Sequence, residues 1–145
     1  MKTYIDTSAL AKWYLNEVGS GQFAEWMVSQ EDTHISTLTM TEFRCLLARR
    51  ERNRELGSLS ARQIYTIFEQ DIELGFLIVQ EVKNADLQEA LVQIERLANL
   101  PLRTLDAMHI AIAERQQMDA IASADKVMLA AAEQLGMTAI SFVPD

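Results

Sequence analysis

Residues 3–10 read Thr-Tyr-Ile-Asp-Thr-Ser-Ala-Leu, and this stretch decides the fold that the sequence predicts. Residues 2–5 form a short strand candidate that leads directly into Asp6, and a helix-forming segment follows at residues 9–15. In open parallel α/β sheets, ligands bind beyond the carboxyl ends of the strands, near a switch point in the strand order. The sequence therefore places Asp6 where a functional site is expected.

The rest of the chain continues the alternation of short strands and helices. Further strands are predicted at residues 34–36, 76–79, 120–122 and 138–143. Helices are predicted at residues 23–30, 39–57, 60–74, 85–98, 104–117 and 125–135. Such alternation implies a parallel sheet that is covered on both faces, and the run at 76–79 has the character of a buried strand. We find no linker or repeat, and we expect one α/β domain over residues 1–145.

Composition and cysteine content indicate a reducing compartment. The 145 residues are 49% hydrophobic and 23% charged, which is ordinary for a soluble globular protein. The single cysteine, Cys45, excludes an intramolecular disulfide, and its leucine neighbours favour a packed thiol. The N-terminus lacks the features of a signal peptide, and no segment is apolar enough to span a membrane. We therefore expect a cytoplasmic protein.

The net charge of −8 counts against a simple nucleic-acid-binding protein, which should be basic. A nuclease can instead contact phosphates through bound cations, which an acidic pocket holds. The basic residues are also unevenly distributed. Six of the 13 lie between positions 44 and 62, namely Arg44, Arg49, Arg50, Arg52, Arg54 and Arg62. This segment is interpreted either as a solvated helix end or as a contact for RNA.

Four acids lie near predicted helix starts, and each has two explanations. They are Asp6, Glu42, Asp106 and Asp125. An acid at such a position can simply cap the helix, and Thr39 with Glu42 matches the capping-box pattern. However, Asp106 opens an almost wholly apolar helix, where an unpaired buried carboxylate would be costly. Several carboxylates together would repel one another, and a divalent cation would remove that penalty.

The residue types favour magnesium over zinc. Magnesium prefers oxygen ligands, whereas zinc prefers histidine and cysteine, and the chain has only His34 and His109. His109 lies three residues beyond Asp106. We interpret it as a packed or hydrogen-bonded structural histidine, because the predicted chemistry does not require it.

Four short motifs carry a resemblance to a known family. The stretch Asp6-Thr7-Ser8-Ala9-Leu10 resembles the opening motif of the PIN-domain family. Residues 41–43 (Thr-Glu-Phe), 105–111 (Leu-Asp-Ala-Met-His-Ile-Ala) and 123–126 (Ser-Ala-Asp-Lys) resemble its second, third and fourth acidic motifs. The motifs occur in the family's order and span nearly the whole chain. The compact length resembles the VapC toxins of toxin–antitoxin pairs.

The resemblance implies a three-layer α/β sandwich whose central parallel sheet has the strand order 3-2-1-4-5, flanked by helices. It also implies hydrolysis of RNA phosphodiesters with Mg²⁺ or Mn²⁺. The implied partners are an RNA substrate such as tRNA or rRNA, a cognate antitoxin and a second copy of the chain. The implied catalytic and metal-binding residues are Asp6, Glu42, Asp106 and Asp125, supported by Ser8 and Ser123. Arg49, Arg50, Arg52 and Arg54 are candidates for RNA or antitoxin contact.

Two alternatives remain open from the sequence. A phosphoacceptor receiver domain is also α/β and binds magnesium, but it needs adjacent acids after strand 1 and an aspartate after strand 3. Here strand 1 is followed by Asp6 alone, and the third strand by Gln80-Glu81. The second alternative is a catalytically silent module that keeps the fold and binds an antitoxin or a nucleic acid.

Overall fold

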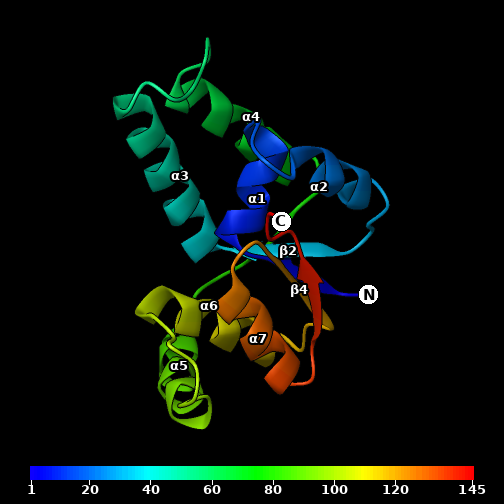
Figure 1. The fold of residues 1–145 in the computed structure, drawn as a ribbon, viewed down its shortest axis with the longest axis vertical. Coiled ribbons are helices and arrows are strands. Elements are labelled where there is room, and N and C mark those ends of the chain that lie inside the picture. The colour runs from blue at the N-terminus through cyan, green and yellow to red at the C-terminus, as the bar shows by residue number, and fades with distance from the viewer.

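Five parallel strands form one sheet in the order β3-β2-β1-β4-β5, in a computed structural model that describes residues 1–145 (Figure 1). The strands are β1 (Thr3–Ile5), β2 (Thr33–Ser36), β3 (Ile78–Gln80), β4 (Ala120–Ser123) and β5 (Thr138–Ser141). All four neighbouring pairs are parallel. The expected strand order is confirmed.

Seven helices cover the two faces of the sheet. One face carries α1 (Thr7–Tyr14), α2 (Ser20–Met27), α3 (Thr37–Arg52) and α4 (Ala61–Glu73). The other carries α5 (Asn84–Arg96), α6 (Thr104–Arg115) and α7 (Lys126–Gln134), as Figure 1 shows. The predicted three-layer sandwich is confirmed. None of these helices combines the length and the hydrophobicity that crossing a membrane requires.

Alternation along β1 divides the core into two parts. Side chains of successive strand residues point to opposite faces of a sheet. Ile5 joins the cluster formed with α1 to α4, and Tyr4 joins the cluster formed with α6 and α7. Both side chains are fully buried, so β1 is covered on both faces.

The pairing of β1 with β4 creates the switch point of the sheet. Ile5 lies opposite Ala122, so the carboxyl ends of the two strands meet at one edge. α1 begins directly after β1, and its N-cap is Asp6. α7 begins shortly after β4, and its N-cap is Asp125. Two of the four predicted acids therefore follow adjacent strands.

Three local expectations need correction. The strand predicted at residues 76–79 is β3, which occupies 78–80 and is an edge strand; Phe76 is 61% exposed and Ile78 is 44% exposed. An edge strand is paired on one side only, so its residues are less completely covered. Cys45 is exposed, because it lies on the outer side of α3 while Phe43 and Leu47 face the core. The third expectation, that the regular spacing of Leu87, Leu91, Ile94 and Leu97 gives residues 85–98 one buried face, holds only for Leu97.

The face of α5 that packs inward consists of polar and small side chains. Leu87, Leu91 and Ile94 are exposed, whereas Ala90 and Gln93 are buried. Asp86 is also buried and accepts a hydrogen bond from Arg115 of α6, at 2.7 Å between Nη1 and Oδ1. An ion pair and small side chains therefore hold α5 against α6.

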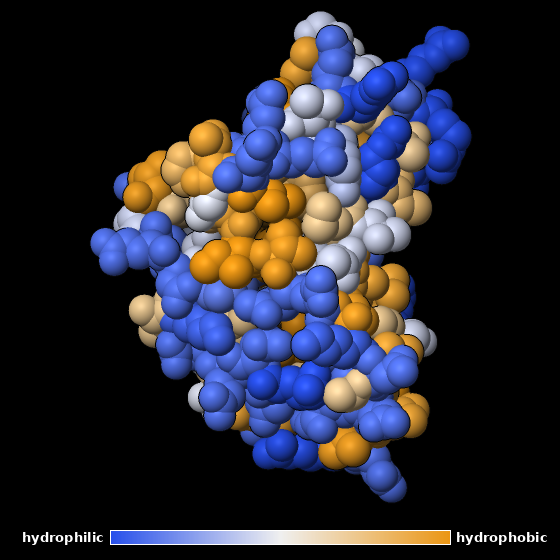
Figure 2. Space-filling model, turned by 180° about the vertical axis from the view of Figure 1, so that it is seen from behind, coloured by the Kyte–Doolittle hydropathy of each residue, from blue (hydrophilic) through white to orange (hydrophobic).

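A separate apolar pocket lies between α1, α2 and the segment that joins α4 to β3. Its volume is about 420 Å³. The lining includes Trp13, Phe23, Met27, Phe76 and Leu77. Figure 2, which shows the molecule from behind, has hydrophobic residues gathered around a hollow near the middle of that face. None of the four predicted acids lines this pocket.

Replacing a phenylalanine with alanine at a buried position and at an exposed position will test the assignment of core and edge residues. Phe43 is fully buried and packs against Tyr14, Tyr65 and Phe68, with ring centroids 5.2–6.3 Å apart. Phe43→Ala is expected to lower the free energy of unfolding by about 3–5 kcal/mol. Phe76→Ala is expected to lower it by less than about 1 kcal/mol, because most of this ring is already in water. Urea unfolding measures both, and equal losses would contradict the assignment of Phe76 to an edge segment.

Candidate functional site

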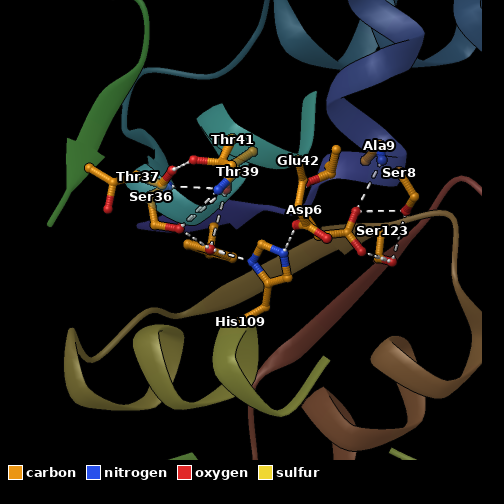
Figure 3. A network of polar contacts seen from close by, with 12 residues as sticks. Asp6, Ser8, Ala9, Ser36, Thr37, Thr39, Thr41, Glu42, His109 and Ser123 are labelled. Carbon is orange, nitrogen blue, oxygen red and sulfur yellow. Dashed lines mark hydrogen bonds and ion pairs between the residues drawn. The ribbon is translucent and has the colours of Figure 1, made fainter. Parts of the chain in front are cut away.

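Asp6 is buried at the centre of a hydrogen-bond network at the carboxyl ends of β1 and β4 (Figure 3). Its Oδ1 accepts hydrogen bonds from the Ala9 backbone N–H at 3.0 Å and from Ser8 Oγ at 2.7 Å. Its Oδ2 accepts a hydrogen bond from Ser123 Oγ at 2.5 Å. Both oxygens of this carboxylate are therefore held in place, and one of the donors comes from the neighbouring strand.

The two serines are themselves oriented by the backbone that follows β4. The Ala124 N–H donates to Ser8 Oγ at 2.9 Å, and the Asp125 N–H donates to Ser123 Oγ at 2.9 Å. Each hydroxyl accepts from the backbone and is left to donate to Asp6. The positions predicted to support Asp6 therefore do contact it.

The environment of Asp6 disfavours an isolated negative charge. Burial raises the pKa of Asp6, and this effect exceeds the opposing effects of the hydrogen bonds from Ser123 and Ser8 and of the charge of His109. The net pKa lies above the ordinary value for an aspartate. A nearby positive charge would stabilise the ionised form.

Glu42 lies in the second turn of α3 and does not cap that helix. The N-cap is Ser36, and the capping box pairs Ser36 with Thr39, so the helix begins at Thr37 and not at Thr39. Glu42 Oε1 instead accepts hydrogen bonds from Thr7 Oγ1 at 2.8 Å and from His109 Nε2. The capping explanation for Glu42 is therefore wrong.

The pKa of Glu42 is lowered. Burial alone would raise it, but the hydrogen bond and charge of His109 and the hydrogen bond of Thr7 outweigh burial. Glu42 is thus held as a carboxylate, whereas the pKa of Asp6 is raised.

His109 and Tyr4 belong to the site although the sequence did not single them out as functional. Tyr4 Oη lies 2.6 Å from His109 Nδ1 and 2.9 Å from Ser36 Oγ. The expectation of a hydrogen-bonded, buried His109 is correct as far as it goes. Two sequence signals pointed to this contact: the spacing of His109 from Asp106, and the alternation that turns Tyr4 toward α6.

The other two acids cap helices. Asp125 Oδ1 accepts from the N–H groups of Val127 and Met128 at 2.7 and 3.2 Å. Asp106 Oδ2 accepts from the Arg103 N–H at 3.1 Å. Each of these carboxylates keeps its second oxygen free of hydrogen bonds within the chain.

The four acids are not gathered into one set of ligands. No group of three or more His, Cys, Asp or Glu side chains is close enough together to hold a metal ion. Asp6 and Asp125 are linked through Ser123, and Glu42 is linked to Thr7 and His109. The donors at this edge are nevertheless carboxylate and hydroxyl oxygens, which are the ligands that Mg²⁺ and Mn²⁺ prefer. The donor set therefore fits a hard divalent cation.

The arginine-rich segment lies at the other end of α3 from Glu42. Ten residues of helix separate Glu42 from Arg52, which corresponds to about 15 Å along the axis. Arg50 is paired with Glu17 and Glu55, at 3.2 and 3.5 Å. Arg49, Arg52 and Arg54 are exposed and form no ion pair within the chain.

Comparisons with known proteins agree with this architecture. The family model described as PIN domain matches residues 3–134. No curated protein sequence matches the chain significantly. Among solved structures, VapC20 of Mycobacterium tuberculosis, a Sarcin-Ricin loop cleaving toxin, has a TM-score of 0.72 at 19% identity, over 90% of this chain and 95% of that one.

Two further solved structures are similar over nearly the whole chain. FitAcB from Neisseria gonorrhoeae has a TM-score of 0.69 at 13% identity, covering 97% of each chain. DNA-bound VapBC from Salmonella typhimurium has a TM-score of 0.66 at 16% identity, covering 98% of each chain. At these identities the likeness is one of fold.

Removing the hydroxyl of Ser123 will test whether it supports Asp6. Ser123→Ala leaves Asp6 Oδ2 and the Asp125 N–H without their partner, and an unsatisfied buried group costs about 1–3 kcal/mol. Ser141 lies opposite Ser123 in β5 but is exposed, so Ser141→Ala is the matched control and is expected to cost less than about 0.5 kcal/mol. Chemical denaturation of both variants measures the difference, and no excess loss for Ser123→Ala would refute the supporting role.

Proposed function

Because the chain belongs to the PIN domain family, we propose that it is a metal-dependent endoribonuclease and the toxin component of a toxin–antitoxin pair. The observation that carries the proposal is Asp6, a buried carboxylate held by two serines where β1 and β4 meet. Its position at the switch point is where an α/β sheet binds its ligand. Burial raises its pKa, and a nearby cation would stabilise its ionised form.

We assign the metal-binding role to Asp6, Glu42, Asp106 and Asp125. Each of the last three keeps a carboxylate oxygen that accepts no hydrogen bond within the chain. When bound, Mg²⁺ or Mn²⁺ lowers the pKa of water and stabilises negative charge on a phosphate. The protein's own part is to hold Asp6 in one orientation through Ser8 and Ser123, and Glu42 through Thr7.

The net charge of −8 makes a local basic contact important for binding RNA. We assign this contact to Arg49, Arg52 and Arg54, which are exposed, and not to Arg50, whose guanidinium is already paired. We call the carboxyl ends of β1 and β4, with the four acids assigned above, the acidic edge. The arginine segment lies at the end of α3 remote from Glu42, so RNA bound there would extend along α3 toward the acidic edge.

The proposed protein partners are a cognate antitoxin and a second copy of this chain. Their support is the similarity in fold to VapBC and FitAB assemblies. An antitoxin that places a cationic side chain among the carboxylates would compete with the metal for the same charge. Residues 1–145 are proposed to act as one PIN domain in the cytoplasm.

The alternatives differ from this proposal in measurable ways. A receiver domain would be labelled by acetyl phosphate, yet Asp6 has no acidic neighbour and β3 ends at Gln80. A silent binding module would bind RNA or antitoxin without cleaving RNA.

Replacing the charge of Asp6 will test the proposed chemistry. Asp6→Asn is expected to abolish RNA cleavage in Mg²⁺ or Mn²⁺, and EDTA is expected to abolish cleavage by the unaltered protein. The melting temperature of Asp6→Asn should be unchanged or higher, because the amide keeps the oxygen that caps α1 and removes a buried charge. Cleavage is measured on a structured RNA, and unfolding by calorimetry.

Asp86→Asn is the matched control, because Asp86 is a buried carboxylate that caps α5 and contacts Arg115, at the opposite end of α6 from Asp106. It should lose stability, since its partner Arg115 loses a charged acceptor, but should keep cleavage activity at temperatures where it is folded. Full cleavage by Asp6→Asn, or an equal loss in Asp86→Asn, is incompatible with the proposed site. An unaltered protein that binds RNA but does not cleave it favours the silent module.

The salt dependence of RNA binding will test the arginine contact. In the uncleaving Asp6→Asn background, Arg49, Arg52 and Arg54 are changed together to glutamine. If each contacts one phosphate, the slope of log affinity against log salt should become shallower by about 2, because each contact to single-stranded RNA contributes about 0.7. Arg96→Gln on α5 is the control and should leave the slope unchanged. An unchanged slope in the triple variant rejects this segment as the RNA contact.

A further inference from the structure

A hydrogen-bonded chain connects three elements on the interior side of the acidic edge. It runs from Ser36 at the start of α3, through Tyr4 of β1 and His109 of α6, to Glu42 of α3. Tyr4 is fully buried and His109 is 3% exposed. In Figure 3 the imidazole of His109 lies between Glu42 and the Ser36–Thr39 turn. Neither Tyr4 nor His109 has a task in the proposed function.

The direction of the hydrogen bond between His109 and Glu42 follows from the groups available. A carboxylate can only accept, so His109 Nε2 donates to Glu42 Oε1. On the other side of the ring, the Tyr4 hydroxyl contacts His109 Nδ1, and it also contacts the hydroxyls of Ser36 and Thr39. The Ser36 and Thr39 hydroxyls contact each other as well, at 3.3 Å.

We propose that His109 is a positioning residue for Glu42, and that Tyr4 holds the His109 ring in the orientation which makes this possible. The proposal rests on the assignment of Glu42 to the metal-binding edge. Thr7 and His109 both donate to Oε1, so Oε2 is the oxygen left for a cation or for water.

The geometry also explains why a histidine is needed at this position. A glutamate has more rotatable bonds than an aspartate and loses more freedom when its carboxylate is fixed. Asp6 is fixed by donors from its own helix and from the adjacent strand, whereas Glu42 lies in the second turn of α3. His109 reaches Glu42 from α6, the helix that also carries Asp106. It therefore links the carboxylate of Glu42 on α3 to helix α6.

The experiment compares variants of His109 that keep different nitrogens. Glutamine places its amide nitrogen the same number of bonds from Cβ as Nε2, and asparagine the same number as Nδ1. His109→Gln should therefore retain the donor to Glu42, and His109→Asn should not. We expect His109→Leu and His109→Asn to weaken Mn²⁺ binding about 10–100-fold, as loss of a partner of a metal ligand does, and His109→Gln to stay within about 3-fold of the unaltered protein. Calorimetric titration with Mn²⁺ on the full chain measures this without any turnover.

Nitrogen-15 NMR of the imidazole supplies a second readout that requires no metal. His109 should carry a proton on Nε2, the nitrogen that contacts Glu42, and Tyr4→Phe should shift the Nδ1 signal. Tyr14→Phe is the matched control, because the Tyr14 hydroxyl also donates to a protein acceptor, Asp71, but far from His109 along the fold. It should leave the His109 signals unchanged.

His34 is the matched control for His109. It is 5% exposed, and its Nε2 also contacts a carboxylate, that of Asp32, at 2.5 Å. His34→Leu should leave Mn²⁺ affinity within about 2-fold of the unaltered protein, because Asp32 precedes β2 and is not at the acidic edge. An equal loss in His34→Leu and His109→Leu would mean general destabilisation and would overturn the proposal.

The remaining outcomes separate this inference from the proposed function. Unaltered Mn²⁺ affinity in His109→Leu, equal affinity of the asparagine and glutamine variants, or a His109 Nε2 that carries no proton each overturns the positioning role alone. If the leucine variant does not fold, the asparagine and glutamine pair and the NMR signal of Nε2 decide. An unaltered protein that binds Mn²⁺ with these dependences but cleaves no RNA overturns the ribonuclease function and supports the positioning role. A protein that binds no Mn²⁺ overturns both.

Discussion

The pairing of β1 with β4 is the constraint on which both the fold and the acidic edge depend. It places Ile5 opposite Ala122 and lets Ser123 reach Asp6 from the adjacent strand. Because β1 is central and covered on both sides, Tyr4 and Ile5 anchor two separate clusters of side chains. The carboxyl end of β1 is therefore the one place where both halves of the sheet, and helices from both faces, come together.

The carboxylates of Asp6 and Glu42 have different hydrogen-bond partners, and their pKa values move in opposite directions. Asp6 is surrounded by neutral donors in a buried setting, and its pKa is raised. Glu42 is less buried and contacts an imidazole, and its pKa is lowered. The difference matters because a cation binds to groups that are ionised or become ionised when it arrives. Asp106 and Asp125 have a third kind of environment, in which one oxygen caps a helix and the other is free.

The sequence predicted most of the elements, because strands and helices alternate and the apolar spacing changes with them. The strand order came from the family resemblance, since no local pattern states which strands pair. The sequence failed where exposure depends on distant neighbours: Phe76 looked like part of a buried strand, yet β3 is an edge, and Cys45 faces outward despite its leucine neighbours. It also misplaced the start of α3, because Ser36 and Thr39 are both good caps and only the geometry selects Ser36. The sequence predicted a structural role for His109 but not its place in the site, because its partners Tyr4 and Glu42 are distant in sequence.

The separation in sequence between the two central strands has a consequence for how the chain is made. Asp6 and Ser123, which holds it, lie 117 positions apart in the sequence. Closing so long a loop is slow, and the central pairing cannot form until β4 has left the ribosome. A chain synthesised only as far as Asp106 therefore carries three of the four acids but not the assembled edge. The acidic edge is completed late in folding, when β4 pairs with β1.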